Sequence, residues 1–93
     1  MNIETLKTYG VLRKRYECSK SDDDRKKLEE IERVFNCILN TENRYIFRLW
    51  CLGYSYSQIT DIIQKDGLYF TRNTVKSKGR RIIQKLKKDG ILC

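Results

Sequence analysis

The sequence predicts an all-α fold, a small helical domain of about five helices with a helix-turn-helix at its C-terminal end. The 93-residue chain has no proline and only five glycines, so few residues interrupt helices. Apolar residues recur at three- and four-residue steps over most of the chain, which is the period of an amphipathic helix. This length fits one compact domain. Within it we separate an N-terminal helical pair for packing or oligomerisation (1–40) from a helix-turn-helix region (41–93).

The first helix is expected over residues 4–16. Its apolar side chains fall on related faces: Ile3, Leu6, Tyr9 and Leu12. Gly10 lies within this helix at a cost of about 1 kcal/mol relative to alanine. A polar loop over residues 19–24 then separates it from the next helix.

The second helix begins at the acidic segment 21–24, which supplies capping oxygens and negative charge near a helix N-terminus. We interpret this acidity as structural, and an acidic protein-binding patch is the alternative. The buried stripe of the helix is expected to contain Leu28, Ile31, Phe35, Ile38 and Leu39.

The third helix, over about 41–52, carries apolar side chains on two sides and is expected to form the centre of the core. Trp50 is interpreted as a core residue, because the apolar residues near it in the sequence are enough to explain a tryptophan at this position. A base-stacking platform or an interface hot spot is the alternative for this tryptophan.

A short fourth helix and a long fifth helix follow. Gly53 is suited to end the third helix, and residues 55–58 fit a capping box, with serine at the cap and glutamine three residues later. Gly67 ends this helix after about ten residues. Thr71 can cap the last helix, which is expected over 72–88.

The net charge of +8 is concentrated in that last segment. Residues 72–93 contain eight lysines and arginines and one acid, whereas the first 71 residues contain twelve bases and eleven acids. Such a stripe attracts polyanions, so it indicates binding to nucleic acid or to an anionic membrane surface.

The helical period divides the last helix into two faces. The inward face is expected to hold Val75, Gly79, Ile82 and Leu86, with Ile83 at its edge and Gly79 allowing close helix contact. The opposite face gathers Asn73, Ser77, Arg80 and Gln84, flanked by Lys76, Arg81 and Lys88.

These outward side chains suit double-stranded DNA. Arginine can grip guanine, and asparagine or glutamine can grip adenine, through two hydrogen bonds in the major groove. We expect Asn73, Ser77 and Arg80 to face base edges, because helix-turn-helix proteins usually present the N-terminal half of this helix to them. Ser57 and Arg72 are expected at phosphates, as are Lys85, Lys87 and Lys88. The nine candidate residues for DNA contact are Ser57, Arg72, Asn73, Lys76, Ser77, Arg80, Arg81, Gln84 and Lys88.

From about Arg44 onward, the chain resembles the helix-turn-helix of region 4 of sigma factors and the small regulators built on it. Residues 45–49 (YIFRL) lead into 53–59 (GYSYSQI), and 74–78 (TVKSK) open a basic last helix. The resemblance implies that this helix enters the major groove, with Arg72, Asn73, Lys76, Ser77 and Arg80 at the reading positions. It also raises RNA polymerase as a further partner. Two features depart from the family pattern: Thr60 replaces a usual alanine, and the 65–71 turn is longer.

The resemblance implies a small transcriptional regulator of phage or mobile-element type. Such a protein would act in the cytoplasm of a bacterial or phage-infected host cell, associated with the nucleoid. Nothing in the chain resembles the sigma region that melts promoters, so a complete sigma factor is not expected.

Several other functions stay open. A DNA-packaging adaptor such as a phage small terminase subunit also pairs a helix-turn-helix with oligomerisation helices, and ring assembly would favour it. An interaction protein could instead present the basic face to RNA polymerase or a sigma factor, and insensitivity to nucleic acid would favour that. RNA binding, a membrane-surface helix and a merely solvated charged face are weaker alternatives. A homodimer through the N-terminal helices is expected because many such readers bind paired half-sites.

Enzymatic, metal and membrane-spanning classes are not expected. The chain has no histidine and no close cysteine pair, so the usual groups of acid–base, nucleophilic and zinc chemistry are missing, and no cofactor is expected. We expect the four cysteines to be reduced thiols, because a disulfide would need an oxidising compartment. No stretch approaches the roughly 20 apolar residues of a membrane span, and no leader is recognisable.

Overall fold

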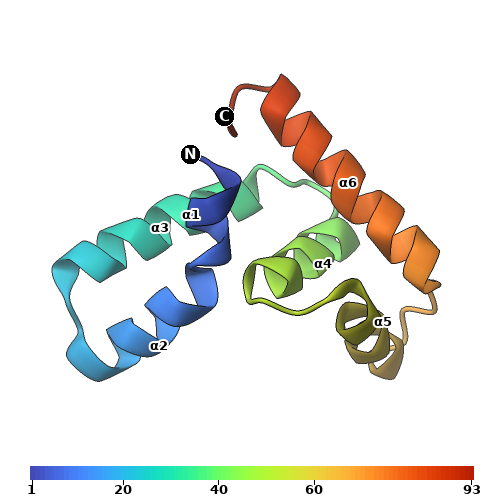
Figure 1. The fold of residues 1–93 in the computed structure, drawn as a ribbon, viewed down its shortest axis with the longest axis horizontal. Coiled ribbons are helices and arrows are strands. Elements are labelled where there is room, and N and C mark those ends of the chain that lie inside the picture. Colours follow the sequence, from blue (N-terminus) through green and yellow to red (C-terminus); the bar gives the residue numbers. More distant parts are fainter.

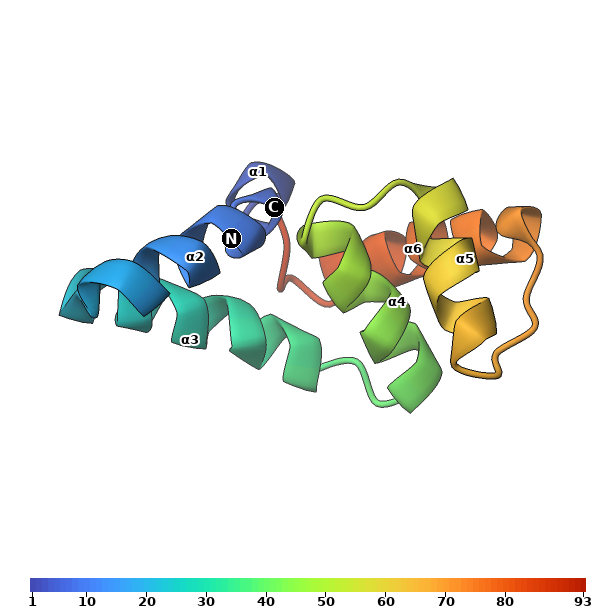
Figure 2. The same ribbon diagram turned by 90° about the horizontal axis from the view of Figure 1, so that it is seen from below.

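The computed structural model describes all 93 residues and confirms the all-α fold, with no strand. There are six helices rather than about five: α1 (Ile3–Lys7), α2 (Tyr9–Ser19), α3 (Asp22–Asn36), α4 (Thr41–Cys51), α5 (Tyr56–Lys65) and α6 (Arg72–Lys88). The protein measures 39 × 30 × 19 Å. Helices α2 and α3 project toward one end of the long axis, α5 and the N-terminal half of α6 lie at the other, and α4 lies between them (Figures 1 and 2).

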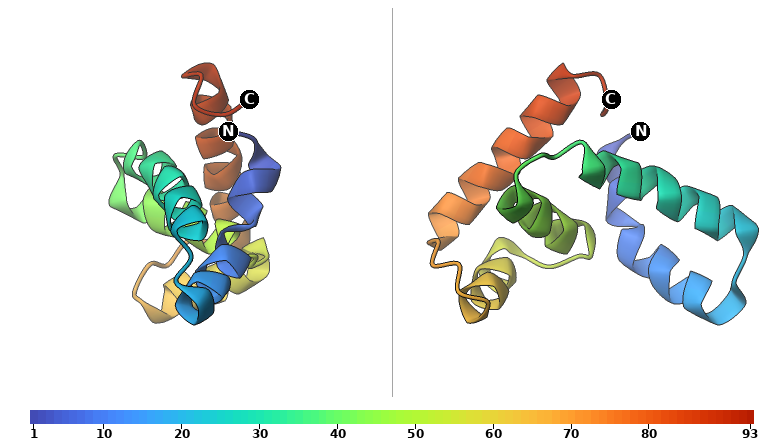
Figure 3. Two further views of the ribbon diagram at one scale, coloured as in Figure 1. Left: turned by 90° about the vertical axis from the view of Figure 1, so that its left-hand side faces the viewer. Right: turned by 180° about the vertical axis from the view of Figure 1, so that it is seen from behind.

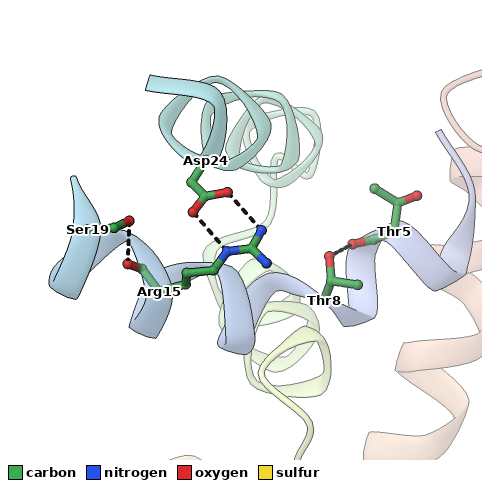
Figure 4. Close-up of polar contacts among 5 residues, drawn as sticks. All are labelled: Thr5, Thr8, Arg15, Ser19 and Asp24. Carbon is green, nitrogen blue, oxygen red and sulfur yellow. Dashed lines mark hydrogen bonds and ion pairs between the residues drawn. The ribbon is translucent and has the colours of Figure 1, made fainter. Parts of the chain in front are cut away.

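The expected first helix is broken at Thr8, which corrects the prediction of one helix over 4–16. The backbone N–H and the hydroxyl of Thr8 both donate to the Thr5 carbonyl oxygen, at 3.2 and 2.6 Å, so the last turn of α1 closes tightly on itself (Figure 4). The bend brings α2 against the end of α4. A β-carbon at Gly10 would lie 3.1 Å from the Leu52 carbonyl oxygen, so the glycine permits a close approach.

A bidentate ion pair joins α2 to α3. The Arg15 guanidinium donates through Nε and Nη2 to the two carboxylate oxygens of Asp24, at 2.9 and 2.8 Å (Figure 4). These hydrogen bonds hold the pKa of the Asp24 carboxyl below its ordinary value. Asp24 is buried, whereas Asp22 and Asp23 are exposed in the first turn of α3. At Asp24, therefore, the acidic segment has a structural role.

Helix α3 ends earlier than its apolar pattern suggests, so the prediction for Leu39 is wrong. The Ile38 N–H donates to the Phe35 carbonyl oxygen at 3.0 Å, and this tight turn ends the helix while keeping Ile38 buried. The Arg44 side chain donates to the Ile38 carbonyl oxygen at 3.0 Å and holds the turn. Leu39 follows outside the helix and is 84 % exposed, while Val34 occupies the buried stripe instead.

Two hydrophobic clusters share α4. The larger one joins α1, α2 and α3 to Phe47 and Cys51 of α4 and to the C-terminal half of α6. The smaller one joins Ile46 and Leu49 of α4 to α5 and the start of α6. Trp50 is half-buried, packs against both clusters and stacks on Phe47 with ring centroids 5.8 Å apart. This packing agrees with the interpretation of Trp50 as a core residue.

The two ends of the chain meet beside the C-terminal end of α6. The marked ends lie near each other in the ribbon (Figures 1 and 3). The Cys93 N–H donates to the Met1 carbonyl oxygen at 2.9 Å, and Leu92 is buried in the larger cluster. The last residues thus tie α6 to α1. None of the six helices has the length and apolar character needed to cross a lipid bilayer.

Candidate nucleic-acid interface

Helix α5 begins as its sequence predicts. The Gln58 N–H donates to Ser55 Oγ at 3.3 Å, and the Ser55 N–H donates to Gln58 Oε1 at 2.9 Å, so the capping box is confirmed. Ile59 and Ile63 are buried. Thr60 is also buried, but its hydroxyl donates to the Tyr56 carbonyl oxygen at 2.7 Å. This side chain therefore leaves no unpaired polar group between the helices.

The turn between α5 and α6 spans residues 66–71. It opens at Gly67, whose φ of +90° lies in the left-handed region that favours glycine. The Tyr45 hydroxyl donates to the Asp66 carboxylate, which raises the pKa of Tyr45. At the other end, Gln64 Nε2 donates to the Phe70 carbonyl oxygen at 3.1 Å. Both α4 and α5 therefore hold this long turn in place.

Helix α6 has the predicted boundaries. Thr71 caps it by accepting a hydrogen bond from the Thr74 N–H at 3.3 Å, and Gly90 follows its C-terminal cap with a positive φ. The predicted inward face is confirmed: Val75, Gly79, Ile82 and Leu86 are buried, and Ile83 is half-buried.

Gly79 sets the distance between α5 and α6. A β-carbon built at this position would lie 2.9 Å from Cε1 and 3.0 Å from the hydroxyl oxygen of Tyr56. The half-buried Tyr56 ring therefore fills the space that a side chain would need, and the predicted close helix contact is present. The sequence pattern did not identify Tyr56 as the partner, because Tyr56 also fits the first turn of α5 as an ordinary exposed residue.

All nine candidate residues are exposed. Eight lie on α6, and Ser57 lies in the first turn of α5. None of the nine side chains makes a hydrogen bond or an ion pair within the protein. The side-chain hydrogen bonds in this part of the chain involve other residues. Their polar groups are therefore available to a partner.

The structure brings some candidates closer together than others. Asn73, Ser77 and Arg81 line one surface hollow of about 330 Å³ near the start of α6. Lys88 lies in the last turn of α6, about 22 Å along the helix axis from Asn73 at a rise of roughly 1.5 Å per residue.

Lys78 differs from the other cations of α6. It is half-buried, and its Nζ lies 4.9 Å from the centroid of the Phe70 ring, in a cation–π contact. Its charge is thus used to hold the end of the turn. Tyr69, in the same turn, is 83 % exposed just before α6, and it is a surface residue that the sequence pattern gave no reason to select.

The charges of the protein are paired at one end only. All three ion pairs lie in α2 and α3, between Arg15 and Asp24, Arg25 and Asp22, and Arg25 and Glu29. Helix α6 contains eight lysines and arginines, no acid and no ion pair. No three cysteine, aspartate or glutamate side chains gather into a group able to hold a metal ion.

The candidate interface is therefore an acid-free helix with a buried inner face and an unpaired polar outer face. Comparison with protein-family models, with curated proteins and with solved structures returns no match.

Proposed function

We propose that this protein binds double-stranded DNA in a sequence-specific manner, as a regulator of transcription, with α5 and α6 acting as a helix-turn-helix. One observation carries the proposal. The outward face of α6 presents Asn73, Ser77, Arg80 and Gln84, all exposed and all without a partner inside the protein. A merely solvated helix face usually mixes charges of both signs, but α6 has no acid.

The spacing of these side chains suits the major groove. Asn73 and Gln84 are eleven residues apart, or about 16 Å along the helix, which corresponds to roughly five base pairs at about 3.4 Å each. The groove is about 12 Å wide and admits one helix. Arg80 is assigned to a guanine and Asn73 to an adenine, because their side chains can form paired hydrogen bonds with those bases.

The flanking cations fit the phosphate backbone. On the helical wheel, Arg72 and Lys76 lie on one side of the outward arc, and Arg81 and Lys88 lie on the other. A helix seated in the groove would therefore have cations facing both DNA strands. Ser57 adds a hydroxyl at the N-terminus of α5, where free backbone N–H groups also favour a phosphate. Four cation–phosphate contacts predict a slope of about −3.6 for log K against log salt concentration.

The test is selection from random duplex DNA at physiological salt, with Asn73→Ala and Arg80→Ala beside the wild type. The matched control is Arg33→Ala, which removes the same exposed and unpaired side chain from α3. Circular dichroism would verify that each variant is folded.

We expect an enriched motif. Arg80→Ala should weaken binding to it by about 1 to 3 kcal/mol and relax one base position, while Arg33→Ala stays within about twofold of the wild type. Weak binding without enrichment that fades with salt would contradict base reading and leave α6 as a phosphate grip. Contact with RNA polymerase and dimerisation through α1–α3 stay predictions from the sequence.

A further inference from the structure

A second surface feature lies beside the C-terminal half of α6, where the α3–α4 connection passes it (Figure 1). Side chains from these two segments, together with Asn43 in the first turn of α4, line a hollow of about 260 Å³. Its floor is apolar and consists of Ile38, Ile82 and Leu86, each less than 9 % exposed. Leu39 stands at its edge with 84 % of its surface in water. The hollow and Leu39 together offer apolar surface on which the side chains of a partner could pack.

The rim of this hollow is positively charged. Arg81 and Lys85 line it one helical turn apart, and both are exposed without an ion pair. Asp89 is the one acid that lines it. Complementary charge selects partners at protein interfaces, so the rim favours an occupant that carries carboxylates.

We propose that this hollow is a docking site for an acidic, amphipathic peptide segment of a partner protein. Apolar anchors of the segment pack on the floor and on Leu39, and its carboxylates pair with Arg81 and Lys85. DNA would satisfy the two cations but leave the apolar floor and Leu39 uncovered. Since Arg81 also belongs to the nine candidate residues, the site borders the proposed DNA-binding face, but it does not depend on DNA binding.

A second copy of this chain is a poorer occupant. Its other large exposed apolar side chains are Val11, Tyr54 and Tyr69. Val11 lies two to four residues before Arg13, Lys14 and Arg15, so the surroundings of that side chain are basic. The exposed acids Asp22 and Asp23 have no large exposed apolar residue beside them in α3.

The probe is a synthetic peptide of about 15 residues, with leucines at three- and four-residue steps and glutamates or aspartates between them. A control peptide keeps the leucines and carries lysines instead of the acids. Binding is measured by fluorescence anisotropy of the labelled peptide. A second readout is the alkylation rate of Cys37, an exposed thiol that lines the hollow, against that of the exposed Cys18 on α2 in the same molecule.

We expect the acidic peptide to bind, to slow alkylation at Cys37 and to leave Cys18 unchanged, while the basic peptide does neither. Lys85→Glu should weaken peptide binding about tenfold relative to Lys87→Glu, which makes the same charge change on α6 outside the hollow. Leu39→Ser, at a side chain already in water, should weaken it about fivefold without loss of fold.

Several results would overturn the proposal. Equal affinity of the acidic peptide for Lys85→Glu and Lys87→Glu would mean that it binds general positive charge. Equal protection of Cys37 and Cys18 would mean the same. Protection of Cys37 by added duplex DNA would make DNA the occupant, and protection that rises with protein concentration alone would make it a second copy. None of these assays requires DNA binding, so their failure leaves the proposed function standing.

Discussion

Adding one methyl group at Gly79 should show how tightly α6 is seated. In a helix interior, alanine is favoured over glycine by about 1 kcal/mol. Here the new β-carbon would lie 2.9 Å from Cε1 of Tyr56, closer than van der Waals contact allows. The Tyr56 ring is half-buried and packs against the smaller cluster, so it cannot swing aside freely. Overpacking of this kind costs about 1 to 3 kcal/mol. Gly79→Ala should therefore lower the free energy of unfolding by about 1 kcal/mol.

The effect of Gly79→Ala on the free energy of unfolding should change sign when the Tyr56 ring is removed. In Tyr56→Ala, the space beside Gly79 is open and only the helix preference remains, so Gly79→Ala should stabilise that background by about 1 kcal/mol. The double-mutant cycle then gives a coupling of about 2 kcal/mol between the two positions. Urea unfolding of the four proteins, followed by circular dichroism, measures each free energy.

The cycle also bears on the proposed function. Displacement of α6 from α5 would move the proposed DNA-reading face relative to Ser57. Gly79→Ala should therefore weaken DNA binding, although Gly79 is buried and contacts no DNA in the proposed arrangement. Stabilisation by the same amount in both backgrounds would refute the reasoning, because it would mean that Tyr56 does not confine position 79.

Three further predictions concern other parts of the protein. Arg15 holds the pKa of Asp24 below its ordinary 3.8, so this pair stabilises the fold above that pH, and its contribution is lost as the pH falls through the lowered pKa. The urea midpoint of Asp24→Asn should therefore lie below that of the wild type at pH 7, and the gap should begin to close only below about pH 4. A gap that stays constant with pH would contradict this. Thr71→Ala should lower the free energy of unfolding in urea by about 1 kcal/mol, and Ser21→Ala should lower it by less than half of that. Of these two residues, only Thr71 makes a side-chain hydrogen bond at its helix N-terminus. Equal losses in the two variants would argue against capping. Burial raises the pKa of Cys51 to about 12. Alkylation at pH 8 should therefore modify the three exposed cysteines of the native protein and reach Cys51 only after unfolding, as measured by mass spectrometry. A fourth adduct on the native protein would be inconsistent with a buried thiol.

The C-terminal helices could be predicted closely because their limits are encoded locally. Ser55, Gln58 and Thr71 act within four residues of themselves, and Gly67 marks a left-handed position. The helical period alone also separates the two faces of α6, so the exposure of the nine candidate residues followed from the buried position of the apolar ones.

The boundaries of the N-terminal helices were harder to predict from the sequence, because they coincide with contacts between residues that are distant in the chain. The break at Thr8 seats Gly10 against Leu52, a residue 42 positions away in sequence. Just beyond the early end of α3, Arg44 of the next helix donates a hydrogen bond to the Ile38 carbonyl oxygen. A periodic pattern extends smoothly across both places, so it predicted one continuous helix in the first and a buried Leu39 in the second.

The candidate site was predicted only in part. The lysines and arginines of α6 could be counted from the sequence. The sequence did not indicate which of them contacts the protein itself, and the structure shows that Lys78 lies over the Phe70 ring. The hollow beside Leu39 depends on where the α3–α4 connection meets α6. No local pattern in either segment encodes that meeting.

The division of α4 between two hydrophobic clusters has a consequence for how the protein unfolds. Phe47 and Cys51 pack toward α1–α3, while Ile46 and Leu49 pack toward α5 and α6. A fragment over 41–93 would leave the first pair facing water, together with the Ile82 and Leu86 side of α6. We therefore expect the two ends of the molecule to unfold as one cooperative unit. A substitution that weakens the core beneath α2 would lower the fraction of molecules in which α6 is packed in its native position, although no atom on the outer face of α6 had changed.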